Sequence, residues 1–399
     1  MKTWVSACLF CLFMLFIFSP LLAQDGVEIF GYFESQIMGT KLNNEFIQLY
    51  SNKLRVDLKS DLSENITFAA NFDYITYHGK TNWNILDFLP SDVVAEVPPG
   101  MEAFYVLPFE NRHFLDNAYI KLSFKQFDLT VGKQQISLGT GYVWNPIDVF
   151  NIKDILDPTY EQPGHNAIRL DIPLGSRYTV TTLYSPEESW KDSAKLLQLK
   201  GRISHFDFTL NAAEKTWRFH DYKQFDFESM NFLEIPERRK LLGGSTAGEI
   251  LGLGVWAEYA YNWMDVSKDF YELVVGSDYT FDFQTYLMIE YYRNTMGKAD
   301  YTQYDLNDWM RLLATEQKAI AQDQIYLFIQ HPATDLLSVG FSTIYALSDN
   351  SFALVPTLNY SFSDNVEIFA YLNLNFGSEG KAFSRKMGNG GLIRVRVYF

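Results

Sequence analysis

The carboxyl-terminal segment, residues 392–399, constrains the fold of this 399-residue chain more than any other stretch. Its side chains alternate between two chemical types: Ile393, Val395, Val397 and Phe399 against Arg394, Arg396 and Tyr398. In a β-strand, such alternation places one type on each face. An apolar face that backs onto two arginines is typical of a strand between lipid and a watery lumen.

The amino terminus indicates export. Lys2, the apolar run of residues 7–18 and the small residue Ala23 predict a signal peptide over residues 1–23. Beyond it, no apolar run reaches the roughly 20 residues that a membrane-spanning helix needs. A chain that crosses a bilayer without such a helix must close its backbone hydrogen bonds as a barrel.

Composition excludes several function classes. The chain has 33 Lys and Arg against 48 Asp and Glu, a formal charge of −15, which argues against nucleic-acid binding. Cys8 and Cys11 are its two cysteines, and both lie in the predicted signal peptide. The mature chain would therefore lack disulfides and thiol nucleophiles. Aromatic residues make up 17% of the chain, as expected if aromatic girdles line two membrane interfaces.

Alternating segments recur along the whole chain. They predict an all-β fold: a transmembrane antiparallel up-and-down β-barrel of about 18 strands, in a single domain over residues 24–399. Residues 239–247 alternate poorly, and the alternative count without them is 16. The predicted strands are residues 27–38, 46–60, 66–78, 112–124, 127–137, 166–173, 177–185, 195–204, 206–217, 238–247, 251–262, 270–281, 284–294, 324–332, 336–346, 352–362, 366–376 and 390–399.

Short and long links alternate between these strands, which is the asymmetry of periplasmic turns and outer loops. The long links are residues 79–111, 138–165, 218–237 and 295–323. Two of them have helical stretches, most clearly Trp309–Ile320. We expect the third loop, at about 138–165, to fold into the barrel.

Alternation also assigns the side chains that face the lumen. Ten bases are expected on this pore wall: Lys53, Arg55, Lys59, Lys121, Lys125, Arg169, Lys200, Arg202, Arg394 and Arg396. Fewer acids share these faces, so the acidic surplus is expected in the loops. Two interpretations stay open: the bases guide anions, or they neutralise acidic groups that fold inward.

Two segments resemble outer-membrane barrels. The ending Tyr398-Phe399 resembles the C-terminal signal by which Gram-negative barrels are recognised for insertion. Residues 132–150 resemble a porin-like family with a strand ending Gly-Lys/Arg-Gln-x-Ile, followed by Trp-Asn-Pro-x-Asp-x-Phe. The matching positions are Gly132, Lys133, Gln134, Ile136, Gly139, Trp144, Asn145, Pro146, Asp148 and Phe150.

The resemblance implies a channel, or an uptake or export barrel, in the cell outer membrane. Its implied partners are outer-membrane lipid, lipopolysaccharide and the barrel-assembly machinery, and a homotrimer is one assembly open to it. The third loop would then form a constriction whose acids oppose the basic wall. Its candidate residues are Trp144, Asn145, Asp148, Asp154, Asp157 and Glu161. The alternatives are a loop that only plugs the barrel, or acids that bind calcium.

The sequence contains no nucleophile elbow, no His-Glu-x-x-His helix and no glycine-rich phosphate loop. We therefore expect no enzyme activity, no cofactor and no metal. The expected function is a porin-like channel for passive diffusion of small hydrophilic or anionic solutes. The alternatives are a polysaccharide-export barrel, a surface-binding barrel and a barrel hydrolase.

Overall fold

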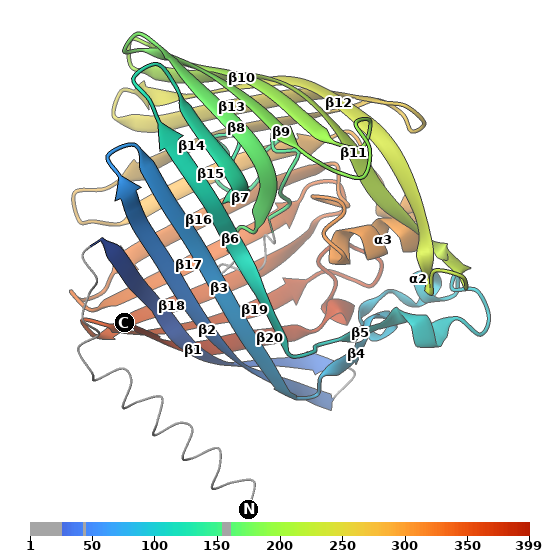
Figure 1. The fold of residues 1–399 in the computed structure, drawn as a ribbon. Helices are drawn as coiled ribbons and strands as arrows, with labels where there is room; N and C mark the ends of the chain where they lie inside the picture. Colours follow the sequence, from blue (N-terminus) through green and yellow to red (C-terminus); the bar gives the residue numbers. More distant parts are fainter. Residues whose placement is uncertain (1–25, 43–44, 154–160) are drawn as a thin grey trace, which may run out of the picture.

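The structure, a computed structural model, describes residues 26–42, 45–153 and 161–399. It is a closed antiparallel barrel of 18 strands (Figure 1), which confirms the predicted fold class. The predicted signal peptide lies outside the described residues. The barrel strands are β1 (Val27–Leu42), β2 (Glu45–Ser63), β3 (Ile66–Gly79), β6 (Arg112–Ser123), β7 (Asp128–Gln135), β8 (Gly164–Leu174), β9 (Tyr178–Ser185), β10 (Ala194–Ile203), β11 (Phe206–Asp226), β12 (Asn231–Ile250), β13 (Leu253–Met264), β14 (Phe270–Thr280), β15 (Tyr286–Asn294), β16 (Asp323–Pro332), β17 (Leu337–Ala346), β18 (Ser351–Ser363), β19 (Val366–Phe376) and β20 (Asn389–Tyr398).

Each barrel strand pairs with its neighbour in the chain, and the last strand, β20, returns to pair with β1. The carboxyl-terminal residue completes this seam. The backbone N–H of Phe399 donates to the carbonyl of Gly31, and Gly31 donates back to Phe399, both at 3.1 Å. The described strands therefore leave no sheet edge open, as membrane insertion requires.

The two faces of the barrel invert the pattern of a soluble protein. In β15, the neighbours Ile289 and Glu290 are 48% and 0% exposed. In β20, the corresponding values are 55% for Ile393 and 7% for Arg394. Apolar side chains thus cover the outside, and charged side chains are buried inside. Such a surface is stable only in lipid, so the protein belongs in the outer membrane. No helix among the described residues is long and apolar enough to cross a membrane.

The expectation for residues 218–237 is wrong. They form no loop, because β11 and β12 continue through them as a long hairpin. The doubtful strand at 239–247 forms within β12. Contacts with other outer segments stabilise the extension: the ring of Phe225 stacks on that of Phe104, with centroids 3.9 Å apart. These contacts join distant parts of the chain, so local alternation could not reveal them.

Short helices occupy the outer loops, at the right of Figure 1. The helix expected at Trp309–Ile320 begins earlier and is shorter, because Asp305 and Asp308 form a capping box and the backbone turns left-handed at Thr315. The loop elements are β4 (Asn82–Asn84), η1 (Ile85–Phe88), α2 (Ser91–Val94), η2 (Glu102–Tyr105), β5 (Val106–Pro108), η3 (Tyr301–Gln303), α3 (Leu306–Leu313) and η4 (Arg385–Met387).

The main apolar core lies at the outer mouth of the barrel. Loop side chains such as Leu89, Trp309 and Phe383 pack against inward wall residues such as Met288 and Ile344. These wall residues belong to β15 and β17. Apolar packing thus fills this side of the mouth, and the polar cavities described below involve the other strands.

Candidate channel constriction

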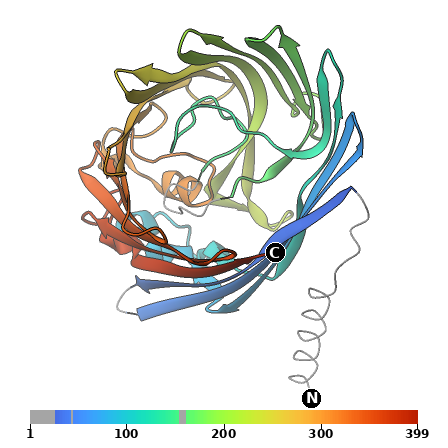
Figure 2. The same cartoon turned by 90° about the vertical axis from the view of Figure 1, so that its left-hand side faces the viewer.

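The third loop leaves the wall after β7 and returns at β8. Its described parts, residues 136–153 and 161–163, lie within the ring of strands (Figure 2). Asp154 and Asp157, two of the expected constriction acids, lie outside the described residues. The other constriction candidates can be placed one by one.

Glu290, on the lumen face of β15, holds the middle of this loop. Its carboxylate accepts hydrogen bonds from the backbone N–H groups of Tyr142, Val143 and Trp144, at 2.7, 3.0 and 3.0 Å. The indole N–H of Trp256 donates to the same carboxylate at 2.8 Å. A buried carboxylate with four donors is fully satisfied, so it fixes the loop backbone against the wall.

Glu258 of β13 holds the flanking turns in the same way. It accepts from the N–H groups of Thr140, Gly141 and Ile147, at 2.8, 3.3 and 2.7 Å. Gly139 makes this possible: its φ is +97°, and a Cβ there would lie 2.6 Å from a Glu258 carboxylate oxygen. The glycine of the sequence motif therefore leaves room for the carboxylate that anchors the loop.

Trp144 and Asn145 attach the loop to its surroundings through side-chain packing and a backbone hydrogen bond. Trp144 is 2% exposed and stacks on Tyr292, with ring centroids 4.8 Å apart. The carbonyl of Asn145 accepts from the ammonium of Lys318 at 2.7 Å, and that ammonium also lies 3.1 Å from the carboxylate of Glu272. Lys318 follows α3, so a second outer segment reaches into the barrel and holds the third loop from above.

Asp148 lies beside the lumen, but its own loop engages it. Its carboxylate accepts from the backbone N–H groups of Phe150 and Asn151, at 2.8 and 3.0 Å, and from the Asn151 side chain at 2.9 Å. Burial raises the pKa of Asp148, and these hydrogen bonds only partly oppose it. Asp148 thus closes a turn of the loop.

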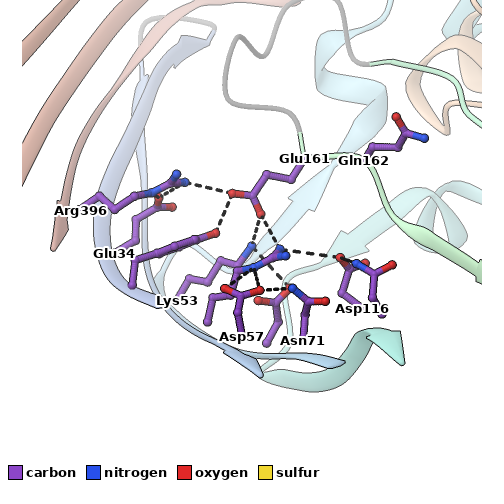
Figure 3. A network of polar contacts seen from close by, with 12 residues as sticks. Glu34, Lys53, Asp57, Asn71, Asp116, Glu161, Gln162 and Arg396 are labelled. Atoms are coloured by element: carbon purple, nitrogen blue, oxygen red, sulfur yellow. Dashed lines mark hydrogen bonds and ion pairs between the residues drawn. The ribbon is translucent and has the colours of Figure 1, made fainter. Parts of the chain in front are cut away.

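Glu161 is the constriction candidate that meets the opposite wall (Figure 3). One carboxylate oxygen accepts from the Tyr32 hydroxyl at 2.6 Å and from Arg396 at 3.1 Å. The other accepts from Lys53 at 2.6 Å and from Arg55 at 3.5 Å. Burial alone would raise the pKa of Glu161, but the charge of Lys53 and these hydrogen bonds, with Arg396, lower it to about 2.

Ion pairs line the wall where the sequence places the pore bases. Eight of the ten expected wall bases have a carboxylate within 4.0 Å. Lys125 lies exposed in the bend after β6, and neither it nor Lys200 has such a partner among the described residues. The pairs are Lys53–Asp73, Arg55–Asp57, Lys59–Glu28, Lys121–Asp128, Arg169–Asp171, Arg202–Asp207, Arg394–Glu34 and Arg396–Glu34.

Three polar cavities lie along this wall. The largest, about 810 Å³, faces the outer loops and is lined by Lys53, Asp148 and Glu161 among others. A second, about 510 Å³, contains Arg55 and Asp57 on the side of the short turns. Lys53 and Arg55 both contact Glu161 but line different cavities, so Glu161 marks the boundary between the two. A third cavity of about 470 Å³ surrounds Lys200.

Every one of these cavities has more bases than acids. Among the described lining residues, the numbers of bases and acids are eight and six in the outer cavity, four and two in the second, and three and one in the third. The chain as a whole is acidic, so the described linings of these three cavities have a charge balance opposite to that of the whole chain. Charged walls of one sign raise the local concentration of the opposite ion.

Sequence reasoning missed the anchors of the loop. Glu258 and Glu290 lie in strands that were predicted, and alternation applied there would have turned both inward. The pattern cannot reveal what they bind, because their partners are backbone N–H groups more than 100 positions away. No group of three or more His, Cys, Asp or Glu in the described part of the chain is placed to hold a metal ion.

No family model and no curated protein matches the chain. Solved structures do match. OccAB2 of Acinetobacter baumannii resembles it with a TM-score of 0.57 and 9% identity, over 94% of this chain and 98% of that one. OccK2 (OpdF) of Pseudomonas aeruginosa, solved in complex with glucuronate, gives the same values. OccAB3 of Acinetobacter baumannii gives a TM-score of 0.55 at 9% identity, over 94% and 99%.

The fold is that of the barrels OccAB2, OccK2 and OccAB3. At such low identity the likeness concerns the fold alone, and function has to be argued from the site.

Proposed function

We propose that this porin-fold barrel is a passive channel for small hydrophilic solutes and favours anions. The observation that carries the proposal is the surplus of bases in all three lumen cavities of an acidic chain. The surplus is small, and most wall bases are paired with acids. An anion would therefore gain enough attraction to enter, but too little to remain bound.

The geometry suggests a route along one side of the barrel. A solute would enter the outer cavity, pass the contacts of Glu161 with Lys53 and Arg55, and reach the second cavity on the short-turn side. Anchored by Glu258 and Glu290, the third loop would set the width of this passage. Binding of glucuronate to OccK2 supports the class of solute by analogy of fold.

Reversal potentials in planar bilayers test the charge preference. Under a potassium chloride gradient, we expect chloride to permeate more readily than potassium, because all three cavities are net basic. Lys121→Glu, in the second cavity on this route, should shift the reversal potential toward potassium. The matched control is Lys268→Glu, in the exposed link between β13 and β14, which should leave it unchanged. Clear potassium preference of the unaltered protein would contradict the proposal.

Liposome swelling tests the size class. Glucose and glucuronate should both enter, with glucuronate faster than its size alone predicts. An acidic polysaccharide should be excluded, whereas its passage would favour the polysaccharide-export alternative.

A further inference from the structure

Glu161 occupies a site that is built for a carboxylate. Each of its two oxygens receives two donors: Tyr32 and Arg396 bind one, and Lys53 and Arg55 bind the other. These donors come from three neighbouring strands, β1, β2 and β20, and they converge on one point of the wall (Figure 3). Charge-assisted hydrogen bonds to both oxygens recognise the shape of a carboxylate as well as its charge.

The wall holds these donors in place independently of the loop. Arg396 lies 2.7 Å from Glu34, and its guanidinium stacks over the Tyr32 ring at 4.0 Å. Arg55 is fixed by Asp57 at 3.0 Å, and Lys53 lies 3.6 Å from Asp73. A site whose donors are already oriented requires little reorganisation when a ligand replaces Glu161.

The charge balance around the site makes its binding weak. Four wall bases meet four wall acids there: Lys53, Arg55, Arg394 and Arg396 with Glu34, Asp57, Asp73 and Asp116. Attraction for a carboxylate therefore comes from directed hydrogen bonds, and no net positive charge traps it. Such a site can release what it binds.

Only the side chain of Glu161 needs to move to vacate the site. Its neighbour Gln162 is fixed, since its backbone carbonyl accepts from the Gln135 side chain at 3.0 Å. The N–H of Gly164 donates to Asp116 at 3.1 Å. The Glu161 side chain itself is 35% exposed to the outer cavity. A solute can therefore reach the site while the backbone of residues 162–164 stays in place.

We propose that Tyr32, Lys53, Arg55 and Arg396 form a binding site for the carboxylate of a solute, and that Glu161 is a tethered competitor for this site. This inference rests on the proposed channel function and assigns to it a preferred solute class, small carboxylates. A tethered group acts at an effective concentration in the millimolar range, so it weakens binding of a free carboxylate and speeds its release.

Calorimetric titration of the folded barrel in detergent with glucuronate tests the site directly. Glu161→Gln removes the competing charge at nearly constant size, and we expect its Kd to fall by about tenfold or more relative to the unaltered protein. Glucose should bind no more tightly to the variant. Glu161→Ala serves as a second variant and should show the same gain.

Two further variants decide the assignment. Adding Lys53→Met to Glu161→Gln should abolish the gain, because the strongest donor to one oxygen is lost. Glu379→Gln changes an acid of the outer loops, where it accepts from Ser91, and should leave the Kd unchanged. An unchanged Kd in both Glu161 variants would overturn the inference.

The titration measures binding without any ion current. The carboxylate site and the proposed anion preference can therefore fail independently of each other. Tighter glucuronate binding in a barrel that prefers potassium would support the carboxylate site and contradict the proposed anion preference. An anion-selective barrel in which both Glu161 variants bind glucuronate as weakly as the unaltered protein would do the reverse.

Discussion

At the scale of single residues, two positions show how the third loop is held near its start and near its end. Gly139 makes room for Glu258 on one wall, and Glu161 contacts the bases of the opposite wall. The loop thus spans the lumen between two sets of polar contacts. Each contact depends on the size or charge of one side chain, so single substitutions can test it.

Gly139→Ala should loosen the start of the loop. Its Cβ would clash with Glu258 and would force alanine into a left-handed conformation, a cost of about 1–3 kcal/mol. We expect larger current fluctuations in single-channel recordings. Gly100→Ala is the matched control, because Gly100 has a similar φ of +85° but open space around its Cβ. Equal, quiet currents in both variants would refute this role for Gly139.

The contact of Glu161 should depend on pH in one direction. Its pKa in the folded protein is about 2, below the ordinary value of 4.5. A lowered pKa means that the contact stabilises the fold fully above about pH 4.5 and is lost as the pH falls toward 2. The difference in unfolding free energy between the unaltered protein and Glu161→Gln should follow this curve. A difference that disappears already at pH 5 would contradict it.

At the scale of elements, the alternation of side chains predicted all eighteen barrel strands, because lipid outside and water inside impose the same period on each. It failed where other contacts set the structure. The β11–β12 hairpin extends because Phe225 packs on Phe104, and α3 ends at Leu313, before the left-handed Thr315, although the helical pattern continues. For the candidate site, sequence reasoning named Glu161, Lys53, Arg55 and Arg396, which the structure brings into contact, but it could not pair Glu290 with the loop.

The segment after α3 should act as a clamp on the third loop. Lys318→Met removes a buried ammonium between Asn145 and Glu272, and leaves Glu272 with Arg239 as its charged partner. We expect the unfolding free energy to fall by about 2–4 kcal/mol and the conductance to rise. Lys298→Met, which removes a partly exposed ammonium that lies 3.9 Å from Asp308, should cost less than about 1 kcal/mol. Similar losses in both would argue against the clamp.

At the scale of the whole molecule, the pairing of β1 with β20 both closes the barrel and brings together residues of the proposed carboxylate site. Tyr32 pairs with Tyr398 across this seam, and Glu34 pairs with Arg396. The donors of the site are therefore assembled only when the barrel closes. An incompletely closed chain would lack both a sealed sheet and a functional lumen.

Phe399→Ala separates closure from the predicted insertion signal. The variant keeps both backbone hydrogen bonds to Gly31, so the purified, refolded barrel should lose no more than about 1 kcal/mol of stability. If the aromatic ending is read during insertion, the amount of folded protein in the outer membrane of cells should fall several-fold. Heat-dependent gel mobility measures the folded fraction. Unchanged levels in cells would remove the signal role from Phe399.

The β11–β12 hairpin has a practical consequence for detecting the protein on living cells. A strand of 21 residues is about 70 Å long, whereas crossing the bilayer uses only about 10 residues. The turn at residues 227–230 therefore lies well beyond the membrane-spanning part of the hairpin, with Phe227 68% exposed. A short epitope inserted there should be recognised by antibody on intact bacteria. Recognition would report the orientation of the barrel in the membrane.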